Sequence, residues 1–199
     1  MPIGGQWQVE YTTKTGEKVS LQSRNVITTV GAYALKAMLP FVKAGDMAPI
    51  SALRYAPIVQ VSVGISNAQG IEHKAFGGLI PTCEQQQLLG ILFPSACFSQ
   101  RCPAEGTLFS FFLGGMKHGE MLGKTNEELR ELVTKALSKM LGFPQDVEPD
   151  MVQIFRHEHA IPQYELSSGA RFAAIKRIEQ AHPGLILGGN LRDGIGMAD

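Results

Sequence analysis

The chain has 199 residues, of which 44% are apolar, a composition typical of a soluble globular protein with a sizeable core. Its 18 Lys and Arg balance its 18 Asp and Glu, which argues against nucleic acid or an anionic membrane as the main partner, because both select a basic surface. No stretch approaches the roughly 20 apolar residues of a membrane span. The start, MPIGGQWQ, lacks the features of a signal peptide.

The first third of the sequence predicts strands followed by one helix. WQVEYT (7–12) and VSLQ (19–22) alternate around a KTGE turn, the pattern of a β-hairpin with one buried face. NVITTV (25–30) is a β-branched strand, and GAYALKAMLPF is a short helix that Pro40 ends. The segment from about Ala48 to Ile65 holds another strand candidate, IVQVSVGI.

The rest of the sequence alternates apolar strands with two helices. LLGILF (88–93) and TLFSFFLGG (107–115) are expected to be central strands. A capping box, Thr125 with Glu128, begins an amphipathic helix that Gly142 ends. MVQIF (151–155) is strand-like, Ser168 is expected to cap a second helix, and 185–187 forms a last strand. The order of elements predicts an α+β fold.

Three local patterns suggest chemistry but are better explained by structure. GEMLGKT (119–125) has one residue too few for a phosphate-binding P-loop, so Thr125 is interpreted as a helix cap. In an extended segment His157 and His159 share a face and Glu158 points away, so a metal site would need further ligands. Cys83, Cys97 and Cys102 are expected to be buried, reduced thiols without a disulfide or a metal. We therefore predict neither a metal site nor a catalytic side chain.

The end of the sequence, GGNLRDGIGMAD (188–199), has the features of a ligand-binding loop. A strand runs into Gly188 and Gly189, and Gly194 and Gly196 precede a segment expected to be helical. Such a loop lets a ligand approach the backbone and presents N–H groups at a helix start. A tight strand-to-helix turn explains the pattern equally well.

Several blocks taken together in this order resemble the C-terminal part of the oxygen-dependent protoporphyrinogen oxidase family, flavoproteins of the flavin amine oxidase superfamily. The blocks are RNVITTVGAYALKAMLP, AFGGLIPTCEQQQLLGILFPSACFSQRCP, TLFSFFLGG, RHEHAIPQYELSSGARFAAIKRIEQAHPGL and ILGGNLRDGIGMAD. The resemblance implies a mixed or antiparallel substrate-binding sheet with flanking helices, joined to the C-terminal strand and loop of an FAD-binding domain. We expect residues 1–155 to be a partial substrate-binding domain and 156–199 to return to the FAD-binding domain.

The resemblance also implies which residues of the terminal loop face the cofactor FAD. They are Gly189, Asn190, Gly194, Ile195, Gly196 and Met197. A helix N-terminus here would stabilise negative charge on the reduced flavin. The family's GxGxxG motif lies in its N-terminal part, and this sequence contains none. We therefore expect a fragment of a longer enzyme, whose complete FAD site needs the N-terminal part. Alone, the fragment is expected to bind FAD weakly or not at all and to be inactive.

For the tetrapyrrole substrate, the resemblance implies a lining made by Phe76, Gly77, Leu79, Leu92 and Phe112, with Leu79 and Phe112 on either side of one ring. A flat apolar slot suits hydride removal from a bridge carbon, which needs positioning rather than a strong acid or base. The expected activity is the oxidation of protoporphyrinogen IX to protoporphyrin IX in heme biosynthesis, with oxygen as acceptor. Each apolar residue is equally consistent with ordinary core packing.

Other functions stay open at this point. A coproporphyrinogen III oxidase would run the same chemistry on a substrate with more propionates, and an amine oxidase or a carotenoid desaturase would use the same scaffold. An amine oxidase favours an aromatic cage near the flavin, to which Tyr164 could contribute. A non-catalytic binding domain is the alternative of another class. We expect a cytoplasmic protein, and leave open peripheral attachment to the inner face of the cell membrane and homo-oligomerisation.

Overall fold

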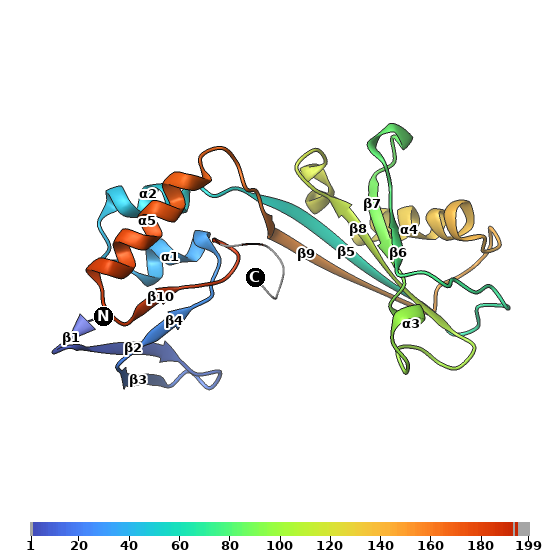
Figure 1. Cartoon of the computed structure of the whole chain (residues 1–199). Helices are drawn as coiled ribbons and strands as arrows, with labels where there is room; N and C mark the ends of the chain where they lie inside the picture. Colours follow the sequence, from blue (N-terminus) through green and yellow to red (C-terminus); the bar gives the residue numbers. More distant parts are fainter. Residues whose placement is uncertain (1, 193, 195–199) are drawn as a thin grey trace. The chain divides into compact units, whose positions relative to one another are not determined.

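The computed structural model describes residues 2–192 and 194, and the chain forms two compact units (Figure 1). Unit 1 comprises Met1–Arg54 and Pro162–Asp199, and unit 2 comprises Tyr55–Ile161. The chain thus leaves unit 1 once and returns to it. These bounds differ from the expected division at residue 155, because the first 54 residues pack with the last segment rather than with the large sheet.

Unit 1 contains a three-stranded antiparallel sheet formed by β1 (Pro2–Ile3), β2 (Gln6–Thr12) and β3 (Lys18–Ser23). The predicted hairpin is confirmed, since Trp7 pairs with Ser23 and Thr12 with Lys18. Its turn is closed by the Thr13 N–H, which donates to the Glu17 carbonyl at 2.9 Å. The buried Trp7 donates its Nε1–H to the Pro183 carbonyl at 3.1 Å, which ties this sheet to the C-terminal segment.

A second sheet of unit 1 pairs a strand from the first part of the chain with one from the last part. Strands β4 (Val26–Thr28) and β10 (Leu185–Leu187) pair in parallel, with Ile27 opposite Ile186. Leu185 and Leu187 are buried on one face, whereas Ile27 and Ile186 are exposed on the other. The carboxyl ends of both strands therefore lie at the same edge, where β10 runs into the glycine-rich loop.

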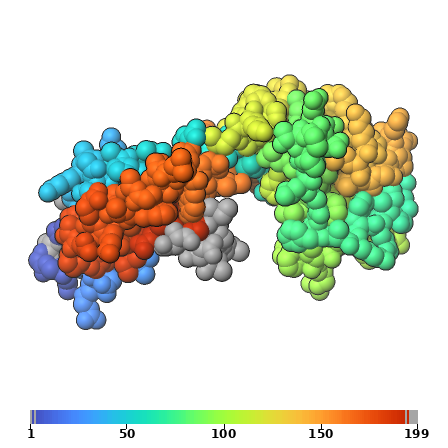
Figure 2. All heavy atoms as spheres, turned by 45° about the horizontal axis from the view of Figure 1, so that its top comes forward, coloured from blue at the N-terminus to red at the C-terminus, as the bar shows by residue number. Residues whose placement is uncertain are grey.

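Three helices complete unit 1, namely α1 (Ala32–Met38), α2 (Ala44–Ser51) and α5 (Ser168–Ala181). Figure 2 shows α2 in light blue beside α5 in orange, in agreement with their contacts. Helix α2 was not predicted: the segment from about Ala48 was expected to hold only a strand candidate, whereas residues 48–51 belong to the helix, with Pro49 inside it. The prediction that Ser168 caps α5 is wrong by one residue: the N-cap is Ser167, whose side chain makes no cap hydrogen bond.

Unit 2 is built on a five-stranded sheet in the order β6-β7-β8-β5-β9. The bounds are Gly77–Leu79 for β6, Leu88–Leu92 for β7, Thr107–Gly114 for β8, Tyr55–Ile65 for β5 and Met151–Pro162 for β9. Strands β6, β7, β8 and β5 pair antiparallel, with a register shift between Leu88 and Gly90. Strand β9 is longer than predicted, since it continues through the His157–His159 segment.

Helix α4 (Asn126–Leu141) covers one face of this sheet and encloses the core of unit 2. The predicted capping box is confirmed: Thr125 Oγ1 accepts from the Glu128 N–H at 3.2 Å, and Glu128 Oε2 accepts from the Thr125 N–H at 2.8 Å. Gly142 ends the helix with φ 77°, as expected of a left-handed C-cap. The core consists of alternate strand residues and one helix face, including Val59, Val61, Val63, Phe109, Phe111, Leu113, Leu129, Val133 and Leu137.

Short elements connect the strands, namely the 3-10 turns η1 (Thr82–Glu84) and η2 (Gly119–Gly123) and the helix α3 (Pro94–Cys97). The prediction of buried cysteines is wrong: Cys83 and Cys97 are exposed and Cys102 is half-buried, and all three are free thiols. They lie in connections rather than in strands, so their apolar neighbours in sequence do not enclose them. Among the helices of the described part of the chain, none has both the length and the apolar character needed to cross a membrane.

The observed architecture agrees with the predicted α+β fold class, because one unit is a largely antiparallel sheet with a covering helix and the other consists of helices and small sheets.

Candidate functional site

The glycine-rich loop begins where the parallel strands β4 and β10 end. The Gly188 N–H donates to the Thr28 carbonyl at 2.9 Å and so extends the pairing by one residue. Gly189 then turns the chain with φ 88°, in the left-handed region that favours glycine. In sheets with parallel strands, ligands bind beyond the carboxyl ends of the strands, which is the position of this loop.

Gly189 tests whether the loop suits a cofactor that approaches the backbone. A Cβ atom built on Gly189 would lie 3.0 Å from the Thr29 carbonyl oxygen, so any side chain here would be strained and would crowd the neighbouring strand end. A Cβ on Gly188 would make only ordinary contacts. Bare backbone at the end of a parallel strand is what a flavin needs in order to approach main-chain groups, so the described part of the loop fits such a cofactor.

The predicted cofactor residues fall partly within the described structure. Gly189 and Asn190 lie at the start of the loop, and Gly194 has φ 152°. Ile195, Gly196 and Met197 lie outside the described residues, so their assignment to the flavin stays a prediction.

Tyr164 contacts the loop through its hydroxyl group, an arrangement that the sequence did not reveal. Its oxygen lies 3.1 Å from the Asn190 carbonyl, 3.2 Å from that of Arg192 and 2.9 Å from that of Gly194. The Gly194 N–H also donates to this hydroxyl, at 3.2 Å. Four main-chain groups of the loop therefore meet at one side-chain oxygen.

Arg171 supports the same loop from inside unit 1. It projects from the buried face of α5, only 3% exposed, and its Nε donates to the Leu191 carbonyl at 2.8 Å. Its guanidinium carbon lies 5.2 Å from the Tyr164 ring centroid and 5.1 Å from that of Phe172, within range of cation–π attraction. Ser168 Oγ accepts a hydrogen bond from Arg171 Nη2 at 3.1 Å. Ser168 thus contacts Arg171 and does not cap α5 as expected.

Glu179, eight residues further along α5, holds both ends of the loop. Its Oε1 accepts from the Leu187 N–H at 3.0 Å, at the end of β10. Both its oxygens pair with Arg192 Nη1, at 3.0 and 3.2 Å. Residues eight apart lie on the same face of a helix, so α5 presents Arg171 and Glu179 together to the loop. Sequence patterns could not identify these contacts, because most of them are to backbone atoms.

In unit 2, the sheet face opposite α4 brings four of the five predicted substrate residues together. Pairing across the strands places Leu79, Gly90, Phe112 and Gln60 in one row, and Gly77, Leu92, Ser110 and Ser62 in the next. Directly paired residues point to the same face of a sheet. Leu79 is 88% exposed, while Leu92 and Phe112 are half-buried. We name the eight residues of these two rows the open face.

Leu79 and Phe112 lie on either side of a glycine on the open face. Gly90 stands between them, and a Cβ on it would be 3.1 Å from Leu79 Cδ2, so the leucine leans over the glycine. Two strand spacings separate their Cα atoms by roughly 10 Å. Gly77 has a structural explanation, since a Cβ there would lie 2.3 Å from the Ile91 carbonyl.

Phe76 is not brought to the open face. It precedes β6, is 69% exposed and lines a hollow with His73, Cys97 and Cys102. His157 and His159 lie in β9, and the described residues contain no group of three or more His, Cys, Asp or Glu placed to hold a metal ion.

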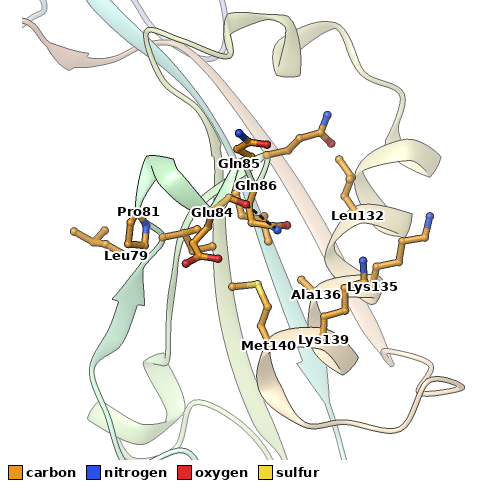
Figure 3. Close-up of a pocket in the computed structure, with 13 residues that line it drawn as sticks. Leu79, Pro81, Glu84, Gln85, Gln86, Leu132, Lys135, Ala136, Lys139 and Met140 are labelled. Carbon is orange, nitrogen blue, oxygen red and sulfur yellow. Dashed lines mark hydrogen bonds between the residues drawn. The ribbon is translucent and has the colours of Figure 1, made fainter.

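A groove of about 590 Å³ lies between α4 and the β6–β7 connection (Figure 3). In Figure 3 Leu79 points away from α4, whereas Lys135, Lys139 and Met140 come from that helix. The groove carries both signs of charge, since Glu84 faces the lysines and Lys135 Nζ is 2.5 Å from Glu131 Oε1. Its mixed lining does not select one class of ligand.

The chain is similar to known proteins in family and in sequence. The model of the family "Flavin containing amine oxidoreductase" matches residues 4–197. The chain is 30% identical over 202 residues to the chloroplastic protoporphyrinogen oxidase of Nicotiana tabacum, which covers 97% of this chain and 37% of that relative. The chain spans less than half the length of the curated relatives it matches.

Two solved structures support the fold. A provisionally named protoporphyrinogen oxidase from Exiguobacterium sp. 255-15 has a TM-score of 0.75 and 18% identity, covering 100% of this chain and 42% of that chain. The cyclohexylamine oxidase of Brevibacterium oxydans IH-35A has a TM-score of 0.61 and 15% identity, covering 87% and 38%. At these identities the likeness concerns the fold alone.

Proposed function

The chain belongs to the family of flavin containing amine oxidoreductases, and on this basis we propose that it is part of a protoporphyrinogen oxidase. The proposed reaction of the whole protein is the FAD-dependent oxidation of protoporphyrinogen IX to protoporphyrin IX, with oxygen as electron acceptor, in heme biosynthesis. This chain would contribute one side of the flavin site and one wall of the substrate site.

The observation that carries the proposal is the extent of the sequence likeness. It includes 97% of the chain, and therefore both the glycine-rich loop of unit 1 and the open face of unit 2. Relatives from Nicotiana tabacum, Oryza sativa, Bos taurus and Homo sapiens all bear the name protoporphyrinogen oxidase. The fold alone would not separate this activity from amine oxidation, because one scaffold serves many reactions.

In unit 1, the loop residues would hold FAD by their backbone. Gly189, Asn190 and Gly194 supply main-chain groups at the end of β10, and Ile195, Gly196 and Met197 are proposed to continue this surface. When bound, FAD supplies the acceptor for the hydride. The bare backbone at Gly189 allows close approach, and Tyr164 and Glu179 hold the loop in place.

In unit 2, the open face would bind the apolar surface of the porphyrinogen. Leu79, Leu92 and Phe112 give it an apolar lining, and burying this lining excludes water from the ring. The chain's contribution to catalysis is orientation, since a correctly held substrate needs no acid or base from these residues.

The same face bears on the choice of substrate. None of the eight residues of the open face is a lysine or an arginine. Coproporphyrinogen III carries more propionates than protoporphyrinogen IX, and unpaired carboxylates on an apolar surface are costly. The open face supplies no cationic partner for the propionates of either substrate, so the choice of protoporphyrinogen IX rests on the names of the relatives.

The test is turnover of both porphyrinogens by the intact protein, followed by porphyrin fluorescence, together with its flavin absorbance. We expect bound flavin and a larger kcat/KM for protoporphyrinogen IX. A protein with flavin that oxidises neither porphyrinogen would refute the proposed substrate, and a larger kcat/KM for coproporphyrinogen III would establish the alternative.

A cytoplasmic location, peripheral membrane attachment and homo-oligomerisation stay predictions. Several of the plant relatives are named as chloroplastic. Fractionation of cells that express the intact protein would test the location.

A further inference from the structure

The contacts beneath the glycine-rich loop point to a function beyond that of the loop itself. We infer that Tyr164, Arg171 and Glu179 are positioning residues that hold residues 187–192 and Gly194 in the flavin-binding shape before the flavin arrives. This inference rests on the proposed function for the identity of the ligand. The three side chains contact the loop's backbone and Arg192, and none belongs to the predicted flavin-contacting set.

The first step of the argument concerns Tyr164. A phenol has one proton to donate, yet three carbonyl oxygens of the loop lie within 3.2 Å of this hydroxyl and one N–H donates to it. An extended loop could not bring residues 190, 192 and 194 to a single atom. The hydroxyl therefore fixes the curvature of the loop.

The second step concerns Arg171, which fixes the depth of the loop. Its Nε donates to the carbonyl of the fully buried Leu191. Leu191 lies between Asn190 and Arg192, whose carbonyls contact the Tyr164 hydroxyl. The Arg171 guanidinium also lies against the Tyr164 ring, so the two side chains restrict each other's orientation. The planar guanidinium suits this combined stacking and hydrogen bonding better than a lysine would.

The third step concerns Glu179, which fixes the span of the loop. One carboxylate holds the Leu187 N–H at the start and the Arg192 side chain five residues later. With both ends attached to the same helical residue, the intervening glycines lose much of the freedom they would otherwise have.

Preforming the loop has a direct consequence for binding. A glycine-rich segment that becomes ordered only on binding loses conformational entropy at that moment, which weakens affinity. A segment held in shape in advance avoids this loss. Removing a positioning residue should thus weaken flavin affinity, while leaving turnover unchanged once the site is saturated, because the positioning residues touch no reacting atom.

The experiment compares Tyr164→Phe and Glu179→Gln with wild type in the intact protein. Tyr164→Phe keeps the ring against Arg171 but removes the hydroxyl, and Glu179→Gln keeps an acceptor for the Leu187 N–H but removes the ion pair with Arg192. Tyr11→Phe, on strand β2, is the matched control for the same chemical change. Three quantities are measured: amide hydrogen exchange of residues 185–192 in flavin-free protein, the Kd for free FAD, and kcat at saturating FAD.

We expect Tyr164→Phe to raise both the exchange rate of the loop amides and the FAD Kd about tenfold, as the loss of one or two hydrogen bonds predicts. Glu179→Gln should give a smaller rise, and Tyr11→Phe should match wild type. In all variants kcat at saturating FAD should equal that of wild type.

Unchanged loop exchange in Tyr164→Phe would overturn the positioning role, and faster exchange with an unchanged FAD Kd would overturn its link to flavin binding. A wild-type protein that binds no FAD would instead refute the proposed function, and the exchange comparison would still decide whether these residues hold the loop.

Discussion

Leu79 offers the sharpest test of the open face, because its side chain is 88% exposed and contributes little to the stability of the fold. Leu79→Ala removes the equivalent of three methylene groups, each contributing about 0.8 kcal/mol when buried. A substrate can cover only the exposed 88% of the side chain, so the lost binding free energy is about 2 kcal/mol. This corresponds to a fall in kcat/KM for protoporphyrinogen IX of roughly 30-fold.

The assay is steady-state porphyrin fluorescence with the unfolding midpoint measured in parallel. The unfolding free energy should change by less than about 0.5 kcal/mol, since surface truncations rarely do more. Leu21→Ala is the matched control, because Leu21 is an exposed strand leucine in unit 1. A kcat/KM of Leu79→Ala within threefold of wild type, at equal flavin content, would refute the assignment of this face to the substrate.

Two further predictions concern the loop and the helix cap. Gly189→Ala should raise the FAD Kd about tenfold or more, because φ is 88° and the added Cβ would crowd the Thr29 carbonyl; Gly123→Ala, whose Cβ would meet open space, should leave it unchanged in the same titration. The hydrogen bond from the Thr125 N–H, followed by that from Lys124, lowers the pKa of Glu128. A lowered folded-state pKa stabilises α4 at neutral pH, and this contribution is lost as the pH falls below the ordinary glutamate pKa of 4.5 and through the lowered one. Acid unfolding of Glu128→Gln should accordingly show a shallower pH dependence, and a profile identical to wild type would contradict this.

The sequence predicted well those features that depend on neighbouring residues. The capping box of Thr125 and Glu128 marks the start of α4, and Gly142 marks its end. The KTGE turn likewise marks the hairpin of β2 and β3. The residues of the open face were assigned from the family resemblance, and the structure places one of them, Phe112, on the opposite face of β8 from the core residues Phe109 and Phe111.

Features that depend on distant segments were not predicted. Strand β4 pairs with β10 near the other end of the chain, and no local pattern reveals this partner, so the expected division at residue 155 differs from the bounds of the two compact units. Helix α2 was not predicted; it contains Pro49, which opposes helix interiors, and its packing against α5 outweighs that local preference. Cysteine burial was misjudged because apolar neighbours in sequence were taken for neighbours in space.

The glycine-rich loop shows how local and distant information combine. Its glycines indicate only that the backbone must turn sharply, a requirement that a plain turn would share. The parallel pairing with β4 places this turn at the carboxyl ends of two strands, where ligands bind. The polar side chains of Tyr164, Arg171 and Glu179 then all bond to it, although a plain turn closed by its own backbone would need none of them. Holding a loop so firmly is useful when an outside group must meet its backbone in one fixed position, and this argues for a bound cofactor over a simple connection.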